Sequence, residues 1–207
     1  MKKLVGVGVV VILALVLVVS ACADDEITEG MDYAREAYEE GSYSEAIEEL
    51  EIAITQIRSL QTDEVRKALP EPLAGWTAED QESQAASFGF FGLGSATVGA
   101  TRRYYEEESD QSIEISIMGE SPLLQQLRVV IQNPGLQPGT ELVIERIAGK
   151  RRKIAEKFSA EDMAGTLSLE LEEKQIFITV EGWDISDKEI LYEYLLGIDF
   201  ELVLEVL

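Results

Sequence analysis

Cys22 is the residue whose type and position point most directly to a chemistry. It is the only cysteine among 207 residues. It stands at the end of an apolar stretch that begins after Lys2 and Lys3 and runs from Leu4 to Ala21. A short cationic region followed by an apolar run has the form of a secretory signal. The alternative is an uncleaved anchor, because this run has roughly the minimum length that spans a bilayer.

The residues around Cys22 carry a family resemblance. Val19-Ser20-Ala21-Cys22 resembles the lipobox of bacterial lipoproteins, in which a branched residue and two small residues precede the cysteine that receives diacylglycerol. The resemblance implies that residues 1–21 are a lipoprotein signal peptide and that palmitate-type chains anchor Cys22. Once Cys22 is acylated, the chain has no thiol for disulfides, thiolate metal sites or nucleophilic catalysis.

The same region predicts where the protein resides. Lys2 and Lys3 hold the amino end in the cytoplasm, so everything after Cys22 lies outside it whether or not the signal is cleaved. Ala23, directly after the cysteine, resembles the address of lipoproteins that are sorted to the outer membrane and face the periplasm of a Gram-negative host.

The sequence lacks some of the residues that enzymes and metal sites commonly use. The chain has no histidine, which removes the usual general base, a common metal ligand and the serine triad. No Asp-x-Asp-x-Asp-Gly loop for calcium is present. We therefore expect no enzyme, no cofactor and no metal. An enzyme with a carboxylate-only or Ser/Lys mechanism remains an alternative, but the 40 acidic residues offer no preferred pair.

Charge narrows the range of partners. The formal net charge is −23, and it becomes more negative when Lys2 and Lys3 leave with the signal. Such a charge disfavours nucleic acid and anionic lipid as bulk partners.

One basic cluster interrupts this acidic chain. Lys150, Arg151, Arg152 and Lys153 form a candidate contact for an anion or a headgroup. On a strand only two of the four can share a face. The alternative is that they pair with the neighbouring Glu141 and Glu145 and protect an edge strand.

A glycine-rich aromatic segment is the second candidate contact. Residues 88–94 place Phe88, Phe90, Phe91 and Leu93 among three glycines. A flexible apolar loop of this kind could touch a bilayer, an apolar ligand or a hydrophobic partner. The alternative is a loop that folds over the sheet and buries its aromatic rings.

Helical periodicity runs from Asp32 to about Lys67. Its second stripe includes Tyr43, Ala46, Ile47, Leu50, Ala53, Ile54, Ile57 and Leu60. Ser42 and Glu45 have the spacing of a capping box and predict where the second helix starts. Residues 37–54 resemble one tetratricopeptide repeat, which implies an interaction module in which Ala34, Ala46 and Ala53 let the helices approach and Leu50 fills their interface. The alternative is that this single hairpin packs on its own downstream domain. We assign residues 22–68 to this helical hairpin.

Residues 69–207 predict a second domain. Trp76 marks a first strand, and Glu79 to Gln84 is expected to form a loop. Alternating apolar residues predict six more strands in antiparallel hairpins, with one face packed and the other largely wet. Helices are predicted after Ser121-Pro122 and after a capping box at Ser186 and Glu189. Asp199 to Leu207 is expected to form a last short helix, although its alternation also suits a strand. The six strands are expected at 96–106, 112–118, 141–147, 150–158, 166–172 and 175–182.

These elements predict an α+β fold: an N-terminal helical hairpin followed by an antiparallel sheet covered by two helices. The element order is vaguely similar to that of photosystem-II-P/Mog1-type folds, which implies docking. We therefore expect a membrane-anchored extracytoplasmic lipoprotein that docks or scaffolds another envelope protein. A carrier or sensor for a lipid or other apolar ligand is the alternative.

Overall fold

The computed structural model describes residues 26–81, 98–119 and 138–207, and it divides the chain into two compact units. The first unit ends at Ser59 and the second begins at Leu60. The division therefore falls within the long helix α2 (Tyr43–Arg66) rather than after residue 68. The lipobox, the loop at Phe88 to Leu93 and the expected helix after Ser121 lie outside the described residues.

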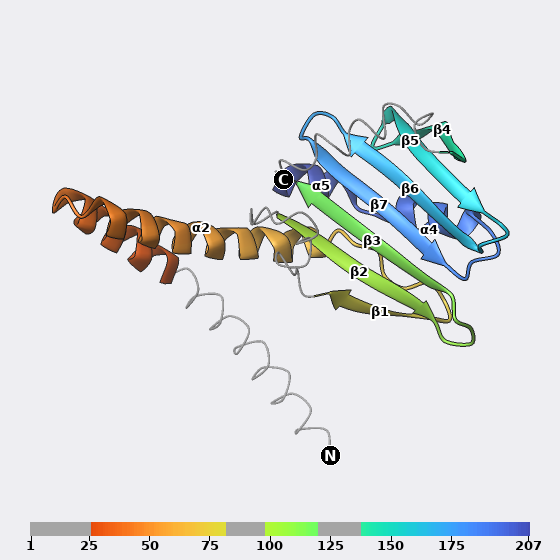
Figure 1. The fold of residues 1–207 in the computed structure, drawn as a ribbon, viewed down its shortest axis with the longest axis horizontal. Coiled ribbons are helices and arrows are strands. Elements are labelled where there is room, and N and C mark those ends of the chain that lie inside the picture. The colour runs from red at the N-terminus through yellow and green to blue at the C-terminus, as the bar shows by residue number, and fades with distance from the viewer. Residues whose placement is uncertain (1–25, 82–97, 120–137) are drawn as a thin grey trace, which may run out of the picture. The chain divides into compact units, whose positions relative to one another are not determined.

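Two antiparallel helices form the described part of the first unit (Figure 1). One helix occupies residues 26–39, and α2 starts at Tyr43, directly after the predicted capping residue Ser42. Gly41 adopts φ +81° between them. The turn closes when the amide of Ser42 donates to the carbonyl of Ala37 at 2.8 Å. Glycine suits this position because a side chain would strain a positive φ.

Small residues bring these two helices together. Ala34 and Ala37 on the first helix and Ala46 and Ala53 on α2 are buried. The resemblance to a tetratricopeptide repeat predicts that Leu50 fills the helix interface, and that prediction is wrong, because Leu50 is 45% exposed. Alanines allow so close an approach that the larger side chains of the predicted stripe are left outside the interface.

The second unit contains a seven-stranded antiparallel sheet (Figure 1). The strand order is β1-β2-β3-β7-β6-β5-β4, so β1 and β4 are the edges. The α+β prediction is confirmed. Glu79 to Gln81 belong to β1, because they pair with β2, so the predicted loop at this point is wrong. The strands are β1 (Trp76–Gln81), β2 (Val98–Glu106), β3 (Ser112–Gly119), β4 (Thr140–Ile147), β5 (Lys150–Ser159), β6 (Ala164–Leu171) and β7 (Ile176–Trp183).

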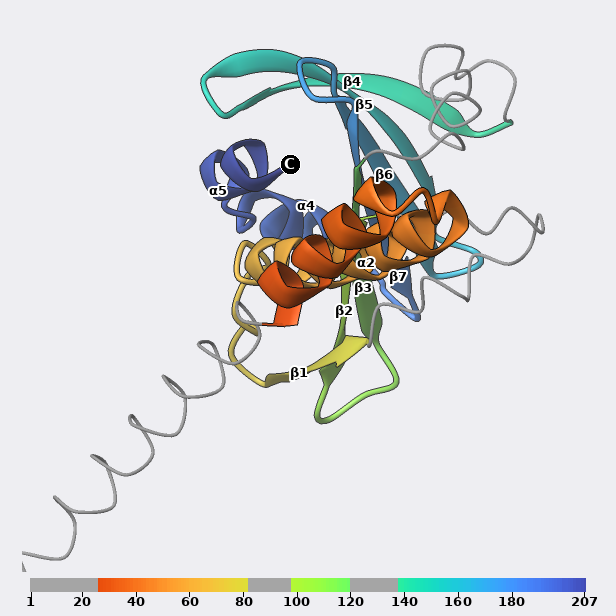
Figure 2. The ribbon, with the colours of Figure 1, turned by 90° about the vertical axis from the view of Figure 1, so that its left-hand side faces the viewer.

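Two helices, α4 (Glu189–Leu196) and α5 (Phe200–Val206), lie along one face of this sheet (Figure 2). Leu191 of α4 fits over Gly165 and Gly182, which are directly opposite one another on β6 and β7. A Cβ atom on Gly165 or Gly182 would come within 2.9 or 2.8 Å of the Leu191 methyl groups. The two glycines thus leave the space that this leucine fills.

The start of α4 differs from the prediction. The cap position is Lys188, and the amide of Glu189 is satisfied by the Asp187 carboxylate at 3.0 Å, so Ser186 is not the cap. The helix begins later than expected because Asp187 offers a nearer acceptor. Its end at Gly197 and the last helix after Asp199 are confirmed.

The opposite face of the sheet is polar but not largely wet. Thr101 and Ser116 are directly opposite one another, and their hydroxyl groups hydrogen-bond at 3.1 Å. Ser116 is nevertheless buried, as are Ala155 and Phe177 on the same face. The expectation of a mainly solvated face therefore holds only in part.

The core of the second unit includes the end of α2. Val65, Ala68 and Leu69 are buried in it, and the amide of Asp199 donates to the carbonyl of Ala68 at 2.9 Å. Residues 60–73 are therefore part of this unit rather than a linker.

A truncation series tests this boundary. We expect a fragment of residues 60–207 to unfold in one cooperative thermal transition. A fragment of residues 74–207 should lose at least about 4 kcal/mol of unfolding free energy, because it lacks the buried Val65 and Leu69 side chains. Circular dichroism melts compare the two, and equal melting temperatures would show that residues 60–73 contribute nothing to the core.

Candidate functional site

A row of large apolar side chains is exposed along α2. The row consists of Tyr43, Ile47, Leu50, Ile54 and Ile57, each between 42% and 62% exposed. The intervals between them alternate between four and three residues, so the side chains follow one side of the helix. We call this row the α2 stripe. Contiguous apolar surface of this kind on a folded chain typically marks an interaction site.

The first helix extends this surface at the turn. The Tyr38 ring is largely exposed, and its centroid lies 5.7 Å from that of Tyr43. Both rings present an apolar body with a polar hydroxyl group, a combination that is enriched in protein interfaces. The sequence pattern identifies the residues of the α2 stripe as members of one apolar stripe, of which Leu50 is expected to fill the interface between the two helices. The signal that separates them is the alanine series, because Ala34, Ala37, Ala46 and Ala53 are the buried residues among residues 26–59.

Acidic residues are concentrated in the chain segment that includes the N-terminal half of the α2 stripe. From Glu36 to Glu51 the chain carries seven glutamates and no lysine or arginine. Over residues 26–59 there are ten acidic side chains and two basic ones, Arg35 and Arg58. The exposed apolar row therefore lies in a field of negative charge.

The basic cluster on β5 does not form a single patch. Arg152 is buried, and its guanidinium donates to both carboxylate oxygens of Glu173 at 2.6 and 2.9 Å. Lys150 reaches the same carboxylate at 3.2 Å. Arg151 and Lys153 are exposed on the other face. The cluster is thus divided by the alternation of the strand, as expected.

Two details of the predicted alternative for this cluster are wrong. In the described part of the chain neither Glu141 nor Glu145 forms an ion pair with the cluster, because Glu173 in the β6–β7 turn approaches instead. Moreover, β5 lies inside the sheet and β4 is the edge strand. Strand order, which the sequence did not reveal, decides both points.

The polar face of the sheet brings one carboxylate pair together. Glu114 and Glu181 are directly opposite one another on β3 and β7. Burial, and then the charge of Glu114, raise the pKa of Glu181. Arg103 pairs with Glu114 at 3.1 Å and lies 5.0 Å from the centroid of Trp183. The pKa of Glu181 is therefore above the ordinary glutamate value of 4.5, although the charge of Arg103 opposes the shift.

A cleft of about 170 Å³ lies beside Glu181. Charged and polar side chains contribute much of its lining, including Lys157, Asp162 and Thr166. Sites for apolar ligands are lined mainly by hydrophobic side chains. This cleft therefore gives no support to the alternative of an apolar-ligand carrier.

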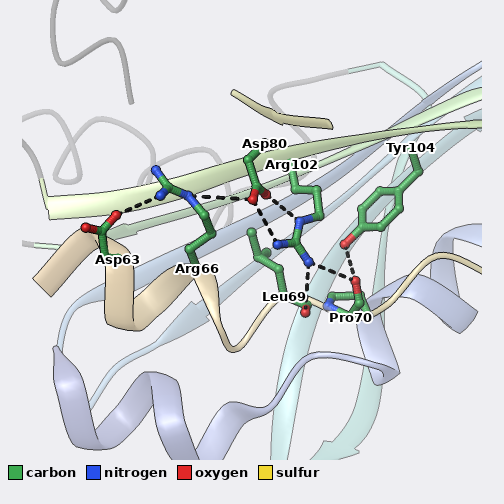
Figure 3. Close-up of polar contacts among 7 residues, drawn as sticks. All are labelled: Asp63, Arg66, Leu69, Pro70, Asp80, Arg102 and Tyr104. Atoms are coloured by element: carbon green, nitrogen blue, oxygen red, sulfur yellow. Dashed lines mark hydrogen bonds and ion pairs between the residues drawn. The ribbon is translucent and has the colours of Figure 1, made fainter. Parts of the chain in front are cut away.

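A second polar cluster holds the second unit together (Figure 3). Arg102 pairs with Asp80 through two hydrogen bonds of 2.5 and 3.1 Å and also approaches the carbonyl oxygens of Leu69 and Pro70. The Tyr104 hydroxyl donates to the same Pro70 oxygen at 2.7 Å. These hydrogen bonds connect residues 69–70 to strand β2. Because the polar groups of the cluster already bond to one another, few of them are available to bind a ligand.

The described residues form neither a metal-binding cluster nor a helix that could span a membrane. Across 26–81, 98–119 and 138–207, no group of three or more Asp or Glu side chains is placed to hold a metal ion. No helix within these same ranges combines the length and apolar character needed to cross a membrane.

The comparisons with known proteins leave the site to be judged on its geometry. No protein-family model, no curated protein and no solved structure matches this chain. Among the candidate surfaces that the described residues form, the α2 stripe is the one with a row of exposed large apolar side chains, which is typical of an interaction site.

Proposed function

We propose that this protein is a membrane-anchored extracytoplasmic lipoprotein that docks another protein of the cell envelope. The anchor is a lipid on Cys22, and the docking surface is the α2 stripe. The observation that carries the proposal is the exposure of five large apolar side chains in one row of a helix whose pairing contact is made by alanines.

The energetics favour this surface over the charged ones. Covering a side chain such as Ile47 or Leu50 contributes roughly 1.5–3 kcal/mol when it is complete. An exposed ion pair typically contributes less than about 1 kcal/mol and is screened by salt. The α2 stripe can therefore supply most of the binding free energy, while nearby charges select the partner.

The anchor and the docking surface complement one another. Two or more acyl chains hold a protein stably on a membrane. Anchoring confines both partners to one surface, which raises their effective concentration and allows a modest interface to suffice. No enzymatic step is part of this proposal.

In-cell photo-crosslinking tests the docking role. A photoreactive residue at Leu50 should cross-link to a discrete envelope protein, whereas the same residue at Thr55, on the polar side of α2, should not. The Cys22→Ser variant should lose labelled-palmitate incorporation and at least about 90% of the cross-link, because the protein no longer shares a surface with its partner. Equal cross-linking from Leu50 and Thr55 would rule out docking through the α2 stripe, and full labelling of Cys22→Ser would rule out the anchor.

A further inference from the structure

We infer that the partner segment bound by the α2 stripe is a basic amphipathic helix. This inference rests on the proposed docking function and specifies the chemistry of its partner. Three properties of the first unit support it: the spacing of the stripe, the charge around it, and the position of its one neighbouring cation.

The spacing fits a helix. Tyr43, Ile47, Leu50, Ile54 and Ile57 recur at an average interval of 3.5 residues. That interval keeps one row of side chains facing a second helix over several turns, where each side chain inserts between those of the neighbour. An extended strand has a side-chain period of two and would match the row at few positions.

The charge selects a basic helix. Glu51 lies on α2 beside the stripe, four residues after Ile47 and three before Ile54, and Glu48 lies one turn before it and farther around the helix. Both belong to the run of seven glutamates without a cation. A partner that carries Lys or Arg along the border of its apolar face would pair with them, and a partner with an acidic border would be repelled.

The same charge disfavours two other occupants. A second copy of this chain would bring ten acidic side chains against ten, with two basic ones on each side. An anionic lipid surface would meet the same repulsion. The apolar row alone does not distinguish these occupants, but the acidic border does.

The position of Arg58 predicts the orientation of the bound helix. Arg58 follows Ile57 at the C-terminal end of the stripe, whereas the glutamates are concentrated toward its N-terminal end, near Tyr43. The basic residues of the partner helix should therefore gather at the end near Tyr43, and a neutral or acidic residue should lie near Arg58.

Binding of synthetic peptides to the full-length protein in detergent tests this inference. The probes are two helical peptides of about three heptads with identical leucine faces. One has lysine at the bordering positions and the other has glutamate. Fluorescence anisotropy should show that the lysine peptide binds at least tenfold more tightly, with an affinity that falls as salt is added.

Matched variants locate the binding surface. Ile47→Ser with Ile54→Ser should weaken binding of the lysine peptide at least tenfold. Ile52→Ser should leave it within about twofold, because Ile52 is also 48% exposed but lies about 200° around the helix from Leu50. Glu48→Lys with Glu51→Lys should weaken binding about tenfold. Glu201→Lys with Glu205→Lys on α5 makes the same change in net charge and should have little effect.

The outcomes separate this inference from the docking function. Equal binding of the two peptides, or no effect of the Glu48 and Glu51 charge reversals, would overturn the basic-helix inference. The docking function would still stand if Leu50 cross-links to a partner. A stable dimer in sedimentation that Ile47→Ser with Ile54→Ser dissolves would also overturn the inference, because a second copy would then cover the stripe. Circular dichroism melts within about 3 °C of the unsubstituted protein confirm that each variant is folded.

Discussion

Glu173→Ala is expected to lower the free energy of unfolding by about 3 kcal/mol. The substitution removes the carboxylate that accepts two hydrogen bonds from Arg152, whose side chain is only 6% exposed. Leaving one partner of a buried ion pair without the other costs about 3–5 kcal/mol, and we take the lower end because Glu173 itself is 30% exposed. Urea denaturation of the full-length protein in detergent measures the change.

A matched control separates this ion pair from the surface charge beside it. Lys150 contacts the same carboxylate but is 64% exposed, so Lys150→Ala should cost less than about 1 kcal/mol. If both substitutions cost the same, the burial of Arg152 does not determine the strength of the interaction.

The pH dependence provides a second test of this ion pair. The hydrogen bonds from Arg152, helped by Lys150, hold the pKa of Glu173 well below the ordinary glutamate value of 4.5. A carboxyl group whose pKa is lower in the folded state stabilises the fold fully at pH values above its unfolded pKa. That stabilisation is lost as the pH falls below about 4.5 toward the folded pKa. The stability difference between the native protein and Glu173→Gln should therefore be constant from pH 7 to about 5 and shrink in more acidic solution. A difference that grows with acidity would contradict the assignment.

Leu191→Ala is expected to lower the free energy of unfolding by about 3–4 kcal/mol. Leu191 is fully buried, and its methyl groups fill the gap that Gly165 and Gly182 leave in the sheet. Removing a leucine from a packed core costs about 2–5 kcal/mol, and the cost is larger where the surroundings cannot collapse into the cavity. Here the floor of the cavity is strand backbone, which cannot move inward, and the side chains of Phe158 and Ile185 line the space above it. Chemical denaturation should show the loss, and a melt should show a decrease of roughly 6–16 °C.

Leu196 is the control on the same helix. It is 57% exposed, so Leu196→Ala should change the free energy of unfolding by less than about 0.5 kcal/mol. A comparable loss at both positions would indicate that α4 as a whole is weakened, rather than that one cavity has formed.

Local patterns were sufficient for most of the elements. Alternation of Ile113, Ile115 and Ile117 predicted β3, and these residues are fully buried on the helix-covered face. The helical hairpin followed from its 3.6-residue period. Errors were concentrated where a second, non-local partner decides the outcome. Glu79 to Gln81 are polar, yet they form a strand because β2 offers them hydrogen bonds.

The candidate site was predicted only in part for a similar reason. The periodicity of α2 identified Ile47, Leu50 and Ile54 as one apolar stripe, but a period does not reveal what lies against it. The buried residues among residues 26–59 are the four alanines, and the larger side chains of the stripe remain exposed. The prediction that the basic residues of β5 are divided between the two faces of the strand is confirmed, but the sequence did not reveal that Glu173 is the partner of Arg152.

The sequence by itself determined the class of the fold, the acidic character of the chain and the absence of histidine chemistry. These properties depend on the residue types and on the hydrophobic periodicity within each segment. Neither changes with the position of the segment in the folded protein. The tertiary structure decided the order β1-β2-β3-β7-β6-β5-β4, the burial of Arg152 against Glu173 and the exposure of the α2 stripe. Each of these features depends on contacts between residues that are distant in the chain. The burial of a side chain is determined by the residues that pack against it, which are often not its neighbours in sequence.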